Sequence, residues 1–376
     1  MNVLIAGDFA PRFRVATLLA ENKYEEVWAE VKAVIQHDVD YAIVNFESPV
    51  VLEDAEAISK TGPHLKCTAK AVESIGYAGF NCVTLANNHF RDYGEKGVRD
   101  TIAVCRDHAI DCVGGGVTLG EAEKVLYKTI KGKTLAIINV CEHEWSIATA
   151  TNGGAAPLNP VANYYKILEA KSQADYVVVI VHGGTEQYNL PTPRMQQVYR
   201  FFIDAGADVV VNHHQHCYSG YEQYHGKYIF YGLGNLCFDR EQPVVDDWNE
   251  GFLLKVMFDK DLKFELIPYM QCAANPAVEL MNDSQPFFSN LQLLNSVIAD
   301  DVLLKQSFDQ LVAQKKAALL ECLEPYGCNR YFKALRHRRL FPSLLSRRQL
   351  RLILAIFRCE AYRDIMFKAV QDRLGA

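Results

Sequence analysis

The sequence predicts an α/β fold with a two-layered β core, helices outside it and a separate helical module at the C-terminus. Three observations favour this. Short apolar runs alternate with amphipathic stretches over residues 1–270, as in βα units. Strand pairs replace helices towards the end of that region. Residues 287–376 lack a convincing strand and instead carry apolar residues at helical spacing. We therefore predict two domains, 1–274 and 275–376.

Each element of the first region has a local signal. Val3–Ala6 and Tyr41–Asn45 are apolar runs typical of strands, and Tyr24–Gln36 between them places its apolar residues on one helical face. Tyr176–Val181 is a β-branched run, typical of a strand buried on both faces. The other predicted helices are Lys70–Ile75, Gly97–His108 and Arg194–Ala205, and the other predicted strands are Cys82–Leu85, Val125–Ile130, Thr134–Val140 and Asp208–Val211.

Two predicted hairpins close the first region. Tyr221–Tyr224 is expected to pair with Tyr228–Tyr231 across a His-Gly-Lys turn. Phe252–Phe258 is expected to pair with Lys263–Pro268 in the same way. The strands of this region therefore change from βα units to antiparallel pairs.

The C-terminal region differs from the rest in charge. Residues 326–376 hold 12 Lys and Arg against three Asp and Glu. Such a run is typical of a solvated helix face, and it could instead bind a polyanion, an acidic partner or a membrane surface. Its main basic residues are Arg336, His337, Arg338, Arg339, Arg347, Arg348 and Arg351.

Composition excludes several classes of protein. The 376 residues are 49% hydrophobic and 22% charged, as in ordinary globular proteins. A net charge of −6 provides no global field that would recruit nucleic acid. No apolar run approaches the ~20 residues of a membrane span, and Met1–Asp8 does not resemble a signal peptide. The 11 cysteines form no C-x-x-C pair, which suits free thiols. We therefore expect a cytoplasmic protein without a transmembrane segment or a nucleic-acid partner.

Side chains of the metal-ligand type follow five of the predicted strands, each at the point where the strand ends. Asp8 follows the first strand, and His182 comes directly after the β-branched run. In open α/β sheets the carboxyl ends of the strands line one crevice, so we expect these residues to share one rim. The set consists of Asp8, Glu47, Asn88, His182, His214 and His216.

The donor types in this set predict a divalent metal centre. Two carboxylates, one amide oxygen and three imidazoles suit Mn, Fe or Zn better than Ca or Mg. Six ligands are too many for one tetrahedral ion but are enough for two ions that share a bridging carboxylate. For single residues other roles stay open: Asp8 could cap a helix, Asn88 could form a turn, and His182 could be a core histidine.

Six short motifs occur in a definite order over residues 1–240. They are Gly7–Ala10, Asn45–Pro49, Leu85–His89 with Asp92 and Gly94, His182–Gly184 with Glu186, His213–His216, and Tyr231–Asn235. In this order they resemble the poly-γ-glutamate capsule biosynthesis, or CapA-like, family of the calcineurin-like metallophosphoesterase fold. The resemblance implies a four-layer α/β/β/α sandwich, and it leaves the helical module outside.

The resemblance also implies a role for each matching residue. His89 would face the substrate and assist an oxyanion or a leaving group. Lys60 and Glu186 would lie near the mouth as substrate-orienting or acid–base groups, and Asn235 would brace the rim. The first metal ion would be bound by Asp8 and His216, the second by Asn88, His182 and His214, and Glu47 would bridge them.

Two positions depart from the family pattern. The phosphoesterase pattern has a histidine two residues after the first aspartate, where this chain has Ala10. The first metal site is therefore expected to have one protein ligand fewer. Most relatives have Gly before the histidine cluster, where this chain has Asn212.

Three functions follow as hypotheses. The first is a metal-dependent hydrolase in which activated water attacks a phosphoester or a glutamyl-type amide of a small molecule, peptide or polymer, in capsule or exopolymer synthesis. The second is a metal-dependent peptide epimerase that moves the Cα proton between groups such as His89 and Glu186. The third is a non-catalytic scaffold for polymer assembly that docks through Arg338 and Arg339.

Overall fold

The computed structural model describes residues 1–324, 326–327, 329–338, 340–358, 366–367, 369–370 and 373–374. Contacts divide the chain into two compact units, Met1–Lys305 and Gln306–Ala376. Within the described residues, every strand lies in the first unit. The division into domains 1–274 and 275–376 stays a prediction.

The first sheet has eight strands and is built around β1 (Asn2–Phe9), which is buried along almost its whole length. β1 pairs in parallel with β2 (Tyr41–Phe46) and in antiparallel fashion with β14 (Glu250–Met257). The order is β16-β15-β14-β1-β2-β3-β4, and β13 pairs with β1. The remaining strands are β3 (Cys82–Thr84), β4 (Asp111–Val113), β13 (Asn235–Cys237), β15 (Lys263–Gln271) and β16 (Val278–Leu280).

The second sheet has six strands in the order β11-β12-β10-β9-β7-β6. Its central strands run parallel, and the antiparallel strands β6 and β11 form its two edges. The strands are β6 (Leu126–Ile130), β7 (Lys133–Cys141), β9 (Tyr176–His182), β10 (Val209–His213), β11 (Tyr221–Tyr224) and β12 (Lys227–Phe230). A small pair, β5 (Gly115–Gly116) and β8 (Gly154–Ala155), lies apart from both sheets.

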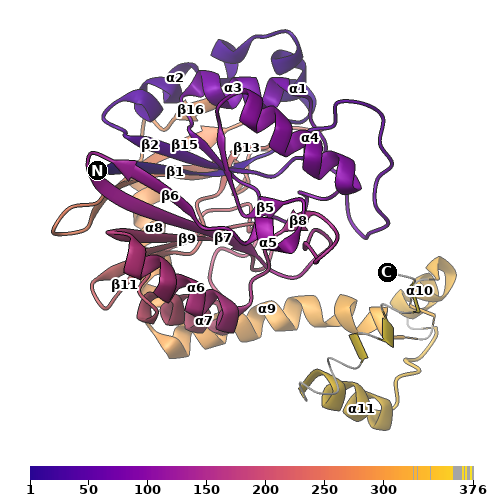
Figure 1. Cartoon of the computed structure of the whole chain (residues 1–376). Coiled ribbons are helices and arrows are strands. Elements are labelled where there is room, and N and C mark those ends of the chain that lie inside the picture. Colours follow the sequence, from indigo (N-terminus) through magenta and orange to yellow (C-terminus); the bar gives the residue numbers. More distant parts are fainter. Residues whose placement is uncertain are drawn as a thin grey trace. The chain divides into compact units, whose positions relative to one another are not determined.

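Helices cover the outer faces of the two sheets, which gives the four-layer α/β/β/α sandwich that was predicted (Figure 1). The alternation along β1 explains the layers: Val3 and Ile5 pack in the core that holds the second sheet, whereas Leu4 packs in the core that holds the first helices. The helices are α1 (Phe13–Ala20), α2 (Tyr24–Gln36), α3 (Lys70–Ala78), α4 (Gly94–Asp107), α5 (Leu119–Ala122), α6 (Pro160–Gln173), α7 (Pro193–Asp204) and α8 (Gln285–Ile298).

The predicted strands and hairpins all form. The elements that were not predicted are the helices α1, α5 and α6 and the short strands β4, β5, β8, β13 and β16. Helix α6 buries only Asn163, Ile167 and Ala170, so its apolar stripe is weak. Its start is nevertheless visible in the sequence, because the Asn159 side chain accepts from the N–H of Ala162 and a proline follows it.

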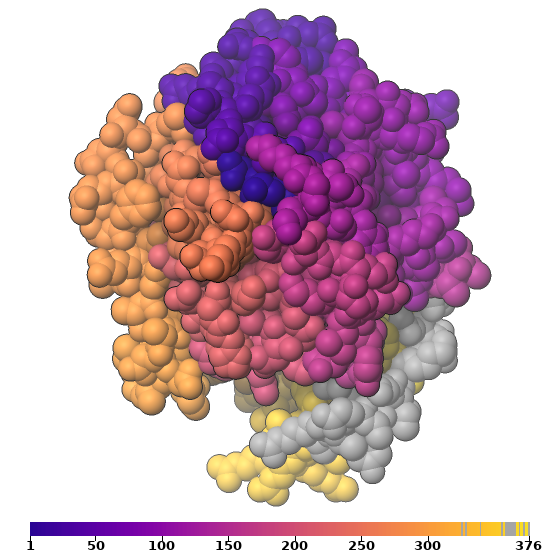
Figure 2. Space-filling view, turned by 60° about the vertical axis from the view of Figure 1, so that its left-hand side comes forward, coloured from indigo at the N-terminus to yellow at the C-terminus, as the bar shows by residue number. Residues whose placement is uncertain are grey.

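The N-terminal residues close one face of the first unit. The N-terminal amine of Met1 donates to the carbonyl of Phe258 over 3.1 Å, and Lys131 forms an ion pair of 2.8 Å with Asp40. Figure 2 shows this face, where indigo N-terminal residues meet magenta and orange segments. Because β1 starts here, the carboxyl ends of β1 and its parallel neighbours lie at the opposite edge of the sheet.

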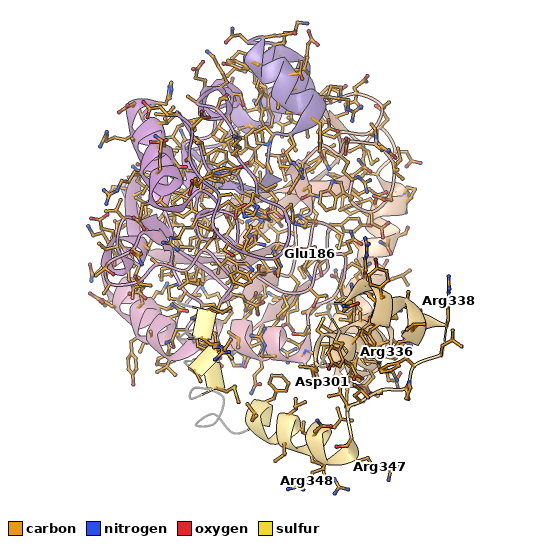
Figure 3. All side chains as sticks on the ribbon, turned by 90° about the vertical axis from the view of Figure 1, so that its right-hand side faces the viewer. Glu186, Asp301, Arg336, Arg338, Arg347 and Arg348 are labelled. Carbon is orange, nitrogen blue, oxygen red and sulfur yellow. The ribbon has the colours of Figure 1, made fainter. Side chains whose placement is uncertain are left out.

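The second unit is helical, as predicted. Its Glu324 carboxylate accepts from the N–H of Leu344 over 2.9 Å and pairs with Arg336 over 3.2 Å. Arg347 and Arg348 extend away from their helix (Figure 3). Arg339, which belongs to the predicted basic run, lies outside the described residues. The helices from α9 onward are α9 (Asp301–Cys322), α10 (Arg330–His337) and α11 (Arg347–Arg358). Among the helices described, we find none with the length and apolar character needed to span a membrane.

Candidate metal centre

The six predicted ligands meet at the carboxyl edge of the parallel strands. Asp8 is the second-last residue of β1, Glu47 follows β2 directly, and His182 is the last residue of β9. All six side chains are buried, with residue exposures of 7% or less. Because both sheets end at this edge, ligands from both reach one place.

Besides a group that joins Glu186 to His214 and His216, the ligand atoms form two overlapping groups around Glu47. Atoms of Glu47, His182 and His214 lie within 4.8 Å of one another, and so do atoms of Asp8, Glu47 and His216. Glu47 belongs to both groups. Asn88 joins the first group, since its Oδ1 lies 3.0 Å from Nε2 of His182. The cluster is compatible with metal binding, and the division into two ion sites stays a prediction.

Of the six predicted ligands, Glu47 has the environment that most favours a bound cation. Both carboxylate oxygens are buried and have no hydrogen-bond partner within the part of the chain that the structure describes. The nearest nitrogens are Nε2 of His182 at 3.6 Å and Nε2 of His216 at 3.8 Å. Burial raises the pKa of Glu47 well above its ordinary value, and the charge of Asp8 raises it further. Burying an unpaired carboxylate is costly, so this arrangement fits a bound divalent ion.

The histidines differ in charge, although all are buried. Burial lowers the pKa of His182 well below its ordinary value and that of His214 to about 3, and a neighbouring histidine lowers each further. Both rings are therefore neutral at pH 7, the form that binds metals. Burial also lowers the pKa of His216, but Glu47 and Asp8 outweigh it and raise the value to about 9. His216 is therefore protonated when no ion is bound, and a metal ion bound to this ring would displace that proton.

Asn45 positions Asp8 and was not among the predicted site residues. Its side-chain amide donates to Asp8 Oδ1 over 2.7 Å, and its own oxygen accepts from Thr84 over 3.1 Å. The N–H of His214 donates to the other carboxylate oxygen over 3.2 Å. A signal was present, because Asn45 lies two residues before Glu47 and so shares its face of the strand.

The histidine loop is held in an unusual backbone conformation. His214 and His216 have φ angles of 89° and 57°, in the region that favours glycine. Asn212 fixes the loop: its amide donates to Gly183 O over 2.9 Å, and the Tyr199 hydroxyl donates to its oxygen over 2.7 Å. The departure from the family's glycine therefore supplies a buried amide that orders the loop.

Ala10 occupies the position at which the phosphoesterase pattern has a histidine ligand of the first ion site. The residue is fully buried and packs with Leu65 and Phe238 in a small apolar cluster. An apolar contact therefore replaces the histidine of the phosphoesterase pattern. The group beside Ala10 in the predicted first ion site has ligand atoms from Asp8, Glu47 and His216.

His89 is oriented by a buried network. Its Nδ1 lies 2.7 Å from Oδ2 of Asp92, which also pairs with Lys60 and accepts from the N–H of Leu65. Burial lowers the pKa of His89, and the hydrogen bond to Asp92 opposes that shift. Nζ of Lys60 lies 3.2 Å from the same Nδ1. We assign the hydrogen to Nδ1 because the nearer Asp92 carboxylate only accepts, and this leaves Nε2 for the pocket. The Lys60 side chain is only 2% exposed, so Lys60 is more enclosed than a mouth residue.

A pocket of about 490 Å³ opens beside the cluster, and His89, His216 and Glu186 line it. In the view of Figure 3, Glu186 lies near the centre of the first unit. Asn235, predicted to brace the rim, has its Oδ1 2.9 Å from Nδ1 of His216. Lys60 and Asn88 also line the pocket.

The loop Glu142–Trp145 follows β7 and reaches the ligand cluster, although Glu144 and Trp145 are exposed. Glu144 accepts from the Asn88 amide over 3.3 Å and lies 3.7 Å from Nε2 of His214. Trp145 lines the pocket beside it. Hydrophobic periodicity could not predict these positions, because the loop belongs to no helix or strand.

The sandwich and the buried ligand cluster define a protein of the metallophosphoesterase-like fold class. A family model described as "Bacterial capsule synthesis protein PGA_cap" matches residues 2–240. The chain belongs to this family, which confirms the resemblance predicted from its motifs.

Curated relatives agree with this placement. The "Capsule biosynthesis protein CapA" of Bacillus anthracis is 33% identical over 248 residues, which cover 64% of this chain and 60% of the relative. The "PGA biosynthesis protein CapA" of Bacillus subtilis is 36% identical over 204 residues, or 54% of each chain. A "Probable polyglutamine synthesis accessory protein" of Mycobacterium tuberculosis is 25% identical over 57% of this chain and 60% of its own. The chain thus spans a little over half the length of these relatives.

Solved structures show weaker likenesses. A hypothetical protein from Thermus thermophilus has a TM-score of 0.45 and 14% identity, covering 71% of this chain and 99% of its own. A 5′-nucleotidase precursor from the same organism has a TM-score of 0.41 and 11% identity, covering 85% of this chain and 59% of its own. Likenesses of this strength support no argument about function.

Proposed function

We propose that this protein is a metal-dependent hydrolase that acts in capsule or exopolymer synthesis, on a phosphoester or a glutamyl-type amide. The observation that carries the proposal is Glu47, a buried carboxylate with no hydrogen-bond donor among the described residues, shared by two ligand groups. The names of the relatives, which refer to capsule and PGA biosynthesis, support the biological setting.

The ligand set fits Mn, Zn or Fe, at one or two ions. Such ions, when bound, polarise a substrate oxygen and acidify water. The proposed ligands of the first ion are Asp8 and His216, those of the second are Asn88, His182 and His214, and Glu47 is shared.

His89 is the proposed proton carrier. Its Nε2 faces the pocket, while Asp92 holds Nδ1 and stabilises the ring when it is protonated. The ring therefore takes up a proton at Nε2 and gives it to the leaving group. Lys60 neutralises the Asp92 carboxylate and keeps the ring in place. Glu186, at the same pocket, orients the substrate.

The proposal is tested with purified protein and Mn²⁺. We expect turnover of bis(p-nitrophenyl) phosphate or of γ-glutamyl-p-nitroanilide. The wild type is compared with His214→Ala, which should lose both metal, by elemental analysis, and activity. No turnover of either substrate at a metal-loaded site contradicts the hydrolase proposal.

An epimerase is the second candidate, because two proton carriers, His89 and Glu186, line one pocket. A metal-polarised carbonyl acidifies the adjacent Cα–H, and paired groups exchange that proton. The discriminating experiment incubates a peptide panel in heavy water. Deuterium incorporation at Cα without hydrolysis favours the epimerase, and absence of exchange eliminates it for those peptides.

The basic helices of the second unit are proposed to bind an acidic or polyanionic partner. Arg338 and Arg347 are exposed, whereas Arg336 is half-buried and pairs with Glu324. If the scaffold hypothesis holds instead of catalysis, Arg338→Glu abolishes function in cells while His89→Ala does not. The cytoplasmic location expected from the sequence stays a prediction.

A further inference from the structure

Arg12 is a partly buried arginine that lines the pocket of the metal centre, four residues after Asp8. Within the described residues its guanidinium makes no hydrogen bond and no ion pair. Its one specific contact is with the ring of Phe13, whose centroid lies 4.7 Å from Cζ. A partly desolvated guanidinium without an anionic partner is unusual, because no ion pair compensates for the hydration free energy that the charge has lost.

The other cations of this region are already paired. Lys60 pairs with Asp92, and Arg240 donates to both oxygens of Asp246 over 3.0 and 2.8 Å. Asp239, which also lines the pocket, is held by Arg14, as the ion-pair distance of 2.7 Å shows.

Glu241 is the one acidic group whose charge acts on Arg12. Burial lowers the pKa of Arg12, and Glu241 raises it. Glu241 nevertheless lies beyond ion-pair distance and is itself exposed. Among the described residues, Arg12 is thus the pocket's cation that lacks a carboxylate partner.

The backbone around Arg12 is held firmly on both sides. The N–H of Ala10 donates to Cys237 O over 3.0 Å, and the N–H of Arg14 donates to Asp239 over 2.9 Å. Phe13 between these anchors has a φ of 46°, which is rare for a bulky residue. Strain of this kind persists where surrounding contacts impose it, often at binding sites. The Arg12 side chain is therefore placed by a fixed backbone.

The pocket's shape and charge define what Arg12 could bind. A volume of about 490 Å³ suits a small organic group. Phe238 and Trp248 form an apolar wall next to His216, with ring centroids 5.2 and 4.7 Å from its ring. Glu144 and Glu186 add negative charge to the lining and so disfavour a dianion. A guanidinium binds a singly charged carboxylate in bidentate fashion.

We propose that Arg12 is the anion-binding residue of this pocket and that the substrate carries a carboxylate on a part that does not react. The part of this inference that concerns turnover rests on the proposed hydrolase function. The part that concerns binding does not.

Two measurements test the inference. The first compares kcat/KM for γ-glutamyl-p-nitroanilide with that for its α-carboxamide analogue. We expect the wild type to prefer the carboxylate by about tenfold or more. Arg12→Gln should remove this preference by raising KM for the carboxylate, with kcat for the carboxamide little changed. Arg12→Lys should keep part of the preference for the carboxylate. Lysine retains the positive charge but lacks the planar guanidinium, which can bind a carboxylate through two parallel hydrogen bonds.

Arg240→Gln is the matched control, since Arg240 lines the same pocket but is paired with Asp246. The inference is supported if Arg12→Gln alone loses the preference. It is overturned if the wild type has no preference, or if both glutamine variants lose it equally. Thermal melts establish that each variant is folded.

The second measurement needs no turnover. Isothermal titration of the purified protein with glutaramate, which carries one carboxylate, and with uncharged glutaramide as a reference, reports binding alone. About tenfold weaker glutaramate binding in Arg12→Gln, but not in Arg240→Gln, supports the inference even if neither amide is hydrolysed. Equal glutaramate binding by wild type and Arg12→Gln overturns it, whatever the fate of the hydrolase proposal.

Discussion

Nδ1 of His89 lies 2.7 Å from Oδ2 of Asp92, and both side chains are buried next to the pocket. This pair ties the pocket-lining His89 ring to a carboxylate that the solvent does not reach. We expect His89→Asn to lower kcat by a factor of about 10² to 10⁴ while the metal content stays unchanged. His37→Asn, at an exposed position, is the control and should have no effect. Loss of metal in His89→Asn would show that the ring is a ligand instead.

The ion pair between Lys60 and Asp92 makes a second prediction, about stability. Both side chains are enclosed, at 2% and 0% exposure. Asp92→Asn leaves the Lys60 charge without a partner, and we expect a loss of about 3–5 kcal/mol in the free energy of unfolding. Urea denaturation measures this. Lys60→Met combined with Asp92→Asn should recover part of the loss, since no buried charge remains. A double variant less stable than Asp92→Asn speaks against this explanation.

Asn212 makes the third prediction. Asn212→Gly, which introduces the residue that the family resemblance implies at this position, removes the acceptor of the buried Tyr199 hydroxyl and the donor to Gly183. We expect a loss of about 1–3 kcal/mol in unfolding free energy, together with weaker metal binding, because the histidine loop loses its support. Tyr199→Phe in the Asn212→Gly background should restore some stability. A variant with unchanged stability and unchanged Mn²⁺ affinity contradicts the assigned role.

Asp40 provides a prediction about pH. Its carboxylate accepts from the N–H of Asn2 over 2.9 Å and pairs with Lys131 over 2.8 Å. Burial raises the pKa of Asp40, but these contacts outweigh it, so the folded-state pKa lies below the ordinary value of 3.8. The stabilisation is therefore fully present above pH 3.8 and is lost as the pH falls through the folded-state pKa.

Asp40→Asn should accordingly reduce stability at pH 7 by about 0.5 kcal/mol and have little effect at pH 2. Urea midpoints of both proteins at the two pH values measure the difference. An equal effect of the substitution at both values would show that the charge of Asp40 does not contribute.

Much of the fold could be predicted because local pattern and tertiary role coincide. The β-branched run Tyr176–Val181 is buried on both faces, and Tyr24–Gln36 is helical over that whole range. The convergence of the proposed ligands Asp8 and His182 could be predicted for a related reason. They end strands, and parallel strands end at one edge of a sheet.

The remaining site residues could not be predicted in this way. Glu144 and Arg12 reach the pocket from irregular segments, where no periodicity indicates which way a side chain points. The role of Asn212 depends on Tyr199 and Gly183, which are close only after folding. Helix α6 was missed because few of its residues are buried.

The central claim is that Glu47 and its neighbours bind divalent ions. The most direct test is the stoichiometry of bound Mn²⁺ in Glu47→Gln beside the wild type, because Glu47 belongs to both ligand groups. The account predicts one or two equivalents of tightly bound Mn²⁺ in the wild type and a large loss in a folded Glu47→Gln protein. Equal Mn²⁺ content and affinity in the two proteins would contradict it.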